Sequence, residues 1–181
     1  PLDETAFPTP AVVLSLDAPI LRAAGLSAAK VIALQDLARK TIDGIVPDTR
    51  TLLQLDDEAI VERLVTVRGI GRWTVQMMLM FQLGRPDVLP VDDYGVRNGF
   101  KLLFKKRELP TPGELARHGA RWAPYRSAAA WYLWRAVDLA KAGELTSALA
   151  DVRAVRSPPP DARTPIRHRP RLRSRAPASK K

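Results

Sequence analysis

The segment Leu64-Val65-Thr66-Val67-Arg68-Gly69-Ile70-Gly71-Arg72-Trp73-Thr74-Val75 carries two glycines on either side of one aliphatic residue. Apolar residues at helical spacing precede and follow these glycines, so the segment predicts two helices joined by a tight turn. Glycine permits such a turn and allows another backbone to approach closely. The aliphatic residue between the glycines can then pack between the two helices.

The second helix is expected to begin at this turn, with the backbone N–H groups of Gly71, Arg72 and Trp73 left without helical partners. A helix N-terminus of this kind binds phosphate through its N–H donors and the helix dipole. Phosphate contacts position a protein on DNA without reading its sequence. The alternative is an ordinary glycine-capped connection between helices. We predict a DNA-phosphate contact made by Arg68, Gly69, Ile70, Gly71 and Arg72.

Helix-capping patterns recur along most of the remaining chain, and no segment alternates apolar and polar residues with the two-residue period of a strand. The fold class expected is therefore all-α, a bundle of short helices. Thr111-Pro112-Gly113-Glu114 has the spacing of a capping box. The longest helix is expected at about 125–142, closed by Gly143. Other helices are expected after N-caps at Thr9, Asp17, Ser27, Asp56 and Asp92.

The positive charge is concentrated at the C-terminal end. Residues 151–181 contain ten Lys and Arg and two Asp, which accounts for +8 of the net charge of +10. The other 150 residues carry only +2, so a local patch would have to attract nucleic acid. We expect a folded domain at residues 1–152 and a disordered, basic, proline-rich tail at 153–181.

Composition excludes several classes of site. The chain has no cysteine and only two histidines, which excludes disulfides, thiolate nucleophiles and Cys-ligated zinc or iron–sulfur clusters. No apolar run is long enough to cross a membrane. The chain opens with Pro1 rather than Met, so we expect a fragment or a gene model that lacks its beginning.

The run 67–75, followed by Leu89-Pro90-Val91-Asp92-Asp93-Tyr94, resembles the helix-hairpin-helix DNA glycosylase superfamily, most closely its 3-methyladenine DNA glycosylase II branch. Further matches lie at 7–10, at 21–27 with Lys30, and at 122–127 with Trp131 and Trp134 after it, so the resemblance covers about 7–142. It implies a monomeric base-excision-repair enzyme that flips an alkylated purine out of duplex DNA. The enzyme would hydrolyse the N-glycosidic bond and leave an abasic site. It would act in the cytoplasm or nucleoid of a bacterium, or in the nucleus of a eukaryote.

The acidic pair Asp92–Asp93 stands at the start of the helix expected at 93–104, and two interpretations of it are open. Capping alone explains Asp92, as N-cap, and can also explain Asp93 in the first turn. The resemblance implies that Asp93 is the catalytic carboxylate. One carboxylate suits the reaction, because it can stabilise oxocarbenium character on the deoxyribose or orient the attacking water.

The resemblance also implies a base pocket formed by Trp134, Met77 and Trp73. Trp134 aligns with the base-stacking tryptophan, and cation–π attraction of about 0.5–2 kcal/mol would favour a cationic methylated base. Met77 stands where the bacterial branch has an aromatic residue. Trp73 occupies the position of the lysine that forms a Schiff base in bifunctional relatives, so water is the expected nucleophile and no lyase step is expected.

No cofactor is expected to be required. The resemblance implies a Na⁺ or K⁺ ion held by the backbone carbonyls of Val65, Val67 and Ile70. A second basic cluster has two equally weighted readings, a DNA contact or a solvated face, and consists of Arg97, Lys101, Lys105, Lys106 and Arg107.

The family's usual upstream helices, which carry an apolar wedge for the gap left by the flipped base, have no counterpart found in this sequence. We therefore expect an incomplete core and reduced or absent activity if the chain really starts at Pro1. Independently of this, two rival functions remain open. One is a non-catalytic DNA-binding module in which Asp93 only caps a helix, and the other is a glycosylase for a different class of lesion.

Overall fold

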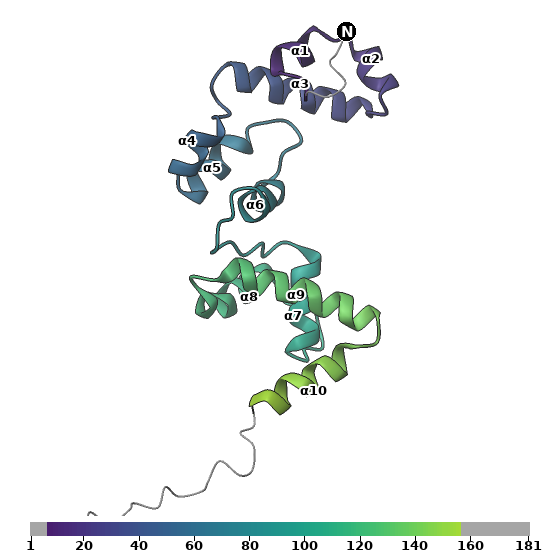
Figure 1. Ribbon diagram of the computed structural model, residues 1–181, viewed down its shortest axis with the longest axis vertical. Helices are drawn as coiled ribbons and strands as arrows, with labels where there is room; N and C mark the ends of the chain where they lie inside the picture. The colour runs from purple at the N-terminus through teal and green to yellow at the C-terminus, as the bar shows by residue number, and fades with distance from the viewer. Residues whose placement is uncertain (1–6, 157–181) are drawn as a thin grey trace, which may run out of the picture.

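The computed structural model describes residues 7–156, and every regular element within that range is helical. This confirms the all-α prediction. Figure 1 shows α1–α3 at one end of the molecule, α4–α6 in the middle, and α7–α10 at the other end. The helices are α1 (Pro10–Ser15), α2 (Ala18–Ala23), α3 (Ala28–Ile42), α4 (Thr49–Gln54), α5 (Asp57–Leu64), α6 (Arg72–Phe81), α7 (Tyr94–Leu103), α8 (Pro112–Gly119), the 3₁₀ turn η1 (Ala120–Trp122), α9 (Arg126–Lys141) and α10 (Leu145–Arg156).

Most helix starts follow the expected capping chemistry. Thr9, Ser27 and Asp56 cap α1, α3 and α5 through side-chain oxygens that accept backbone N–H groups. Asp17 precedes α2 without a side-chain hydrogen bond to it. The capping box predicted at Thr111 is confirmed, because Glu114 accepts the Thr111 N–H at 2.8 Å while the Thr111 hydroxyl oxygen accepts the Glu114 N–H at 3.2 Å.

Two helices have no counterpart in the sequence analysis. The first is α4, which Asp48 caps by accepting the N–H of Thr51 at 2.8 Å. The second is α10, which continues to Arg156 across the domain boundary expected at residue 152. From residue 157 onward, the tail expected to be disordered lies outside the described residues. Within residues 7–156, no helix combines the length and apolar character needed to cross a bilayer.

Two apolar clusters form the core. The first lies in the middle of the molecule, and the second joins α7, α8 and α9. Met80 packs against both clusters, so the end of α6 links them. The first cluster comprises Leu52, Ile60, Val61, Leu64, Val75, Leu79 and Val88, and the second comprises Val96, Phe100, Leu115, Ala130 and Leu133.

Polar contacts fasten the segment between α6 and α7 to the start of α9. The Arg126 guanidinium donates to both oxygens of Asp87, at 2.6 and 2.8 Å. The Ser127 hydroxyl donates to the Arg85 carbonyl at 2.7 Å and accepts the Val88 N–H at 2.9 Å. The pKa of Asp87 lies below its usual value, chiefly because of the Arg126 hydrogen bond. These bonds fix the path of the chain towards α7.

The crossing of α7 and α9 depends on Gly99. A Cβ at this position would lie 1.9 Å from the Leu133 carbonyl oxygen, which is backbone and cannot swing away. Only glycine lets the two helices approach this closely.

We predict that Gly99→Ala lowers the free energy of unfolding by about 3 kcal/mol, because the two helix backbones must move apart. Gly113→Ala is the matched control, since its Cβ would meet nothing nearer than the Arg117 Nη1 at 3.8 Å. The free energy of unfolding of the control is expected to stay the same or to rise by up to about 1 kcal/mol. Urea unfolding followed by circular dichroism measures both, and equal stabilities for the two variants would contradict the prediction.

Candidate active site

Asp93 lies where three helices meet. Its Oδ1 accepts the Val96 N–H at 2.7 Å and the Trp134 indole N–H at 2.8 Å. Its Oδ2 accepts the indole N–H of Trp73 at 2.7 Å. The carboxylate therefore receives donors from the start of α6, the first turn of α7 and the middle of α9.

The assignment of Asp92 as the helix cap is wrong. Asp93 is the N-cap of α7, and its side chain accepts the Val96 N–H. The Asp93 N–H bonds the Pro90 carbonyl at 3.1 Å, which closes a turn with Val91 and Asp92 in its centre. Helical backbone consequently begins one residue later than predicted, and Asp92 is left exposed in the turn.

The three donors hold the carboxylate in one orientation. An ionised carboxylate offers about four lone-pair positions, so three donors leave about one for a further partner. Asp93 is half-buried and its partner Trp73 is 50% exposed, so the group keeps some contact with solvent. A charge fixed by preset donors needs little reorganisation when it meets a developing positive charge.

A glycine makes room for one of these indoles. A Cβ on Gly95 would lie 2.7 Å from Cδ1 of Trp134 and 3.1 Å from Oδ1 of Asp93. The glycine in the first turn of α7 thus permits the Trp134–Asp93 hydrogen bond. Sequence reasoning missed this residue, and its position two residues after Asp93 is the signal that could have revealed it.

Of the three residues assigned to the base pocket, Trp73 and Trp134 bond Asp93, and Met77 lies on the same face of α6 as Trp73. Trp73 and Met77 are four residues apart on α6, and Phe81 follows four later, so they form one stripe. Phe81 is 61% exposed and stacks on Trp134, with ring centroids 6.0 Å apart. Trp73 has a role that the sequence did not predict, as a hydrogen-bond donor to Asp93.

The glycine-bounded turn has the expected form. Gly69 adopts a positive φ of 80°, and Gly71 is the N-cap of α6 and has no side chain to accept the helix N–H groups. Ile70 is half-buried and packs against the first apolar cluster. The start of α6 therefore presents backbone donors, as expected of an anion-binding helix terminus.

Helix α3 clamps this turn. The Asp36 carboxylate accepts the Arg68 N–H at 2.7 Å and the Lys40 ammonium at 2.9 Å. The same ammonium donates to the Thr66 carbonyl. The Arg68 hydrogen bond, followed by that of Lys40, lowers the pKa of Asp36 below its usual value. The turn is thus held by an ion pair on a neighbouring helix.

The two arginines beside the turn differ. The Arg72 guanidinium pairs with Glu58, with Nη1 donating to Oε2 at 3.0 Å, so part of its charge is compensated. Arg68 is exposed and makes no ion pair within the described residues.

In the second basic cluster, Arg97 donates to the Pro110 carbonyl at 2.8 Å, which gives it a structural contact.

We predict that Gly69→Ala destabilises the protein by about 1–2 kcal/mol, because an L-residue at this φ is strained and its Cβ would lie 3.2 Å from that of Ala33. Gly71→Ala is the matched control, with an ordinary φ of −97° and open space around the added carbon. We expect it to change stability by less than about 1 kcal/mol. Chemical denaturation separates the two, and a harmless Gly69→Ala would contradict the assigned turn geometry.

Together, an all-helical core, a glycine turn that opens one helix and a carboxylate that opens the next define a helix-hairpin-helix protein with a candidate catalytic acid. Residues 2–124 match the HhH-GPD superfamily base excision DNA repair proteins. The chain belongs to this superfamily.

The chain is similar to named relatives in yeast and bacteria. It is 44% identical over 134 residues to DNA-3-methyladenine glycosylase 1 of Schizosaccharomyces pombe, covering 74% of this chain and 59% of that protein. It is 32% identical to DNA-3-methyladenine glycosylase 2 of Escherichia coli, covering 71% of this chain and 42% of that protein. This chain therefore spans less than two thirds of the length of either relative.

A solved structure agrees with the same fold. The S. pombe 3-methyladenine DNA glycosylase in complex with abasic DNA superposes with a TM-score of 0.68, covering 74% of this chain and 65% of that one. The DNA-3-methyladenine glycosidase of Bacillus halodurans gives a TM-score of 0.66 at 35% identity, covering 72% of this chain and 60% of that one.

Proposed function

We propose that this protein is a DNA glycosylase that hydrolyses the N-glycosidic bond of alkylated purines, such as 3-methyladenine, in duplex DNA. The observation that carries the proposal is the Asp93 carboxylate, fixed by two indole donors and a helix start beside the glycine-bounded turn. Relatives with DNA-3-methyladenine glycosylase names and a neighbour bound to abasic DNA support it.

The proposed reaction starts with a nucleotide turned out of the duplex. The turn at 69–71 would hold a backbone phosphate through the N–H groups at the start of α6. The bond from the sugar to the cationic base breaks with its electron pair going to the base. Asp93 stabilises the positive charge on the sugar, and water adds at the same carbon and releases a proton. The products are free base and an abasic site.

The residues around Asp93 favour water as the nucleophile. Trp73 carries no amine, and its N–H is committed to Asp93 Oδ2. No Schiff base can form from an indole at this position. We propose a monofunctional enzyme that leaves the DNA strand intact.

Base selection would rest on the aromatic groups beside the carboxylate. Trp134 and the exposed Phe81 offer electron-rich faces, and Met77 lies on the same stripe of α6. Such faces attract a cationic alkylated base more than a neutral one, by about 0.5–2 kcal/mol. The lability of the glycosidic bond in an alkylated purine supplies further discrimination.

The backbone carbonyls of the turn have unused acceptor capacity, which supports a site for a monovalent cation. Within the described residues, the carbonyls of Val65 and Ile70 accept no hydrogen bond outside the helices, and Val67 accepts only the Ile70 N–H, at 3.1 Å. Neutral carbonyl oxygens with free lone pairs suit a hard cation. We propose that these three carbonyls would hold Na⁺ or K⁺, which would add positive charge beside a bound DNA phosphate.

We predict that Asp93→Asn lowers the single-turnover excision of 3-methyladenine or 7-methylguanine by about 100-fold or more, because the negative charge is lost. Binding to an abasic-site duplex should change little. The amide oxygen can still cap α7 and accept the Trp134 indole N–H, but the amide nitrogen cannot accept the Trp73 indole N–H. We therefore expect Asp93→Asn to lower the free energy of unfolding by about 1 kcal/mol, and Asp93→Ala, which loses all three bonds, to lower it by about 2–3 kcal/mol. Full excision by Asp93→Asn would contradict the catalytic role, and a wild-type chain that binds duplex without excising any base would support the non-catalytic module.

A panel of duplexes that carry 3-methyladenine, 7-methylguanine, uracil or 8-oxoguanine tests the substrate class. We expect alkali-labile sites only with the alkylated purines, because only these bases are cationic. Strand breaks should appear only after alkali treatment. Stronger release of uracil or 8-oxoguanine would overturn the alkylated-base assignment, and breaks without alkali would overturn the monofunctional one.

A further inference from the structure

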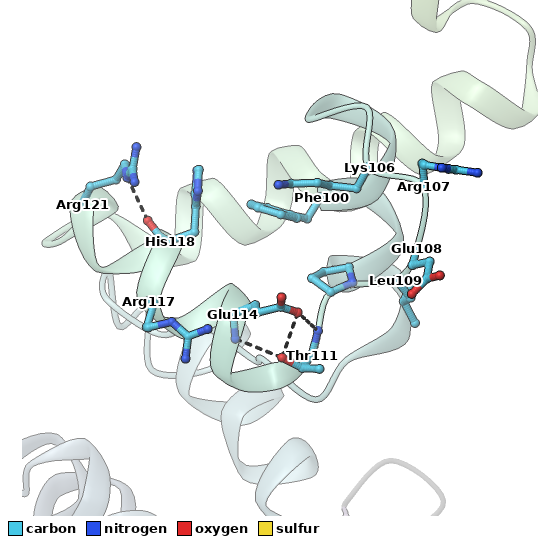
Figure 2. A pocket seen from close by; sticks show the side chains of 11 residues that line it. Phe100, Lys106, Arg107, Glu108, Leu109, Thr111, Glu114, Arg117, His118 and Arg121 are labelled. Atoms are coloured by element: carbon cyan, nitrogen blue, oxygen red, sulfur yellow. Dashed lines mark hydrogen bonds between the residues drawn. The ribbon is translucent and has the colours of Figure 1, made fainter.

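A basic concavity lies away from the carboxylate, at the other end of α7. It has a volume of about 1070 Å³ and is bounded by α8 on one side and by the segment 106–111 on the other. Figure 2 shows Lys106 extending towards the α8 side, whereas Arg107 and Glu108 point away from the hollow. Phe100, in its lining, follows Asp93 by seven residues, which is about 10 Å along a helix.

One wall is a single helical stripe. Glu114, Arg117, His118 and Arg121 recur at the spacing that places side chains on one face of α8 and η1. The opposite wall comes from the loop after α7 and carries charged side chains as well. It consists of Lys106, Arg107 and Glu108.

The charge of this concavity is unbalanced. Lys106, Arg107, Arg117 and Arg121 form no ion pair within the described residues. The acids of the lining are Glu108 and Glu114, and Glu114 already accepts the Thr111 N–H at 2.8 Å and its hydroxyl at 2.9 Å. Hydrogen bonds from Thr111, followed by the charges of Arg117 and Lys106, lower the pKa of Glu114 below its usual value. This carboxylate therefore offsets part of the positive charge, and the lining keeps an excess of two cations over its two carboxylates.

An aromatic cluster fixes the middle of the basic wall. The His118 ring packs edge to face on Phe100 at 4.8 Å and on Trp122 at 5.3 Å between centroids. Burial, followed by the positive charges of Arg121 and Lys106, lowers the pKa of His118 below its usual value. The cations of both walls therefore repel added positive charge at this point, and an anion would relieve that repulsion.

We propose that this concavity is a second phosphate-binding site, in which Arg117, Arg121 and Lys106 hold a phosphate group. Guanidinium groups match phosphate oxygens with two parallel N–H donors, and the lysine adds a point charge. The phosphate comes either from the DNA backbone or from a free phosphate compound. This site does not depend on excision at Asp93.

The first test titrates inorganic pyrophosphate into the full chain by calorimetry. Wild type and Arg117→Ala/Arg121→Ala are compared with Arg22→Ala/Arg50→Ala, in which two exposed arginines outside the concavity are removed. We expect binding to weaken at least about tenfold in the first variant, and by no more than about twofold in the control. Equal pyrophosphate affinity in all three proteins would overturn the proposal.

The second test distinguishes the source of the phosphate. The slope of log K against log salt is negative, and each lost contact to the backbone of a duplex makes it shallower by about 0.9. If the slope for undamaged duplex is shallower by about 2 in Arg117→Ala/Arg121→Ala and unchanged in the control variant, the DNA backbone is the source of the phosphate. An unchanged slope with lost pyrophosphate binding identifies a free phosphate compound. If hexaglutamate binds the concavity as tightly as pyrophosphate, an acidic peptide is the ligand and the phosphate assignment is overturned.

Discussion

One carboxylate joins three helices by accepting an N–H group from each of them. The Asp93 side chain starts α7 and also receives the indole N–H groups of Trp73 and Trp134. Charge-assisted hydrogen bonds of this kind are roughly twice as strong as neutral ones. The group that would act on the sugar therefore also fixes the positions of α6, α7 and α9 relative to one another.

Glycines make this arrangement possible at close quarters. Gly99 lets α7 cross the backbone of α9, and Gly95 leaves room for the indole of Trp134. Gly69 turns the chain with a positive φ, and the Asp36 carboxylate on α3 accepts the N–H of the preceding residue, Arg68. The turn and the carboxylate are thus both held by neighbouring helices, as a preorganised site requires.

The helical class and most helix starts were predictable from local sequence, because caps and turns depend on residues a few positions apart. The choice of Asp93 as the candidate catalytic residue came from the family resemblance, since local sequence favoured Asp92 as the cap. The prediction that Asp92 caps α7 was wrong, because a turn closed by the Asp93 N–H and the Pro90 carbonyl shifts the helix start by one residue. The role of Trp73 required a contact with Asp93, twenty residues away, which no local pattern encodes. The Arg72–Glu58 pair and the basic concavity likewise arise only when separate helices come together.

The most direct measurement is a crystal structure of the chain bound to a duplex that contains a cationic pyrrolidine in place of the damaged nucleotide. We expect the pyrrolidine nitrogen to lie within about 4 Å of an Asp93 oxygen, with the flanking phosphate at the N–H groups of α6. A duplex bound with its pyrrolidine far from Asp93, or with Asp93 shielded from it by the two indoles, would contradict the catalytic role of Asp93.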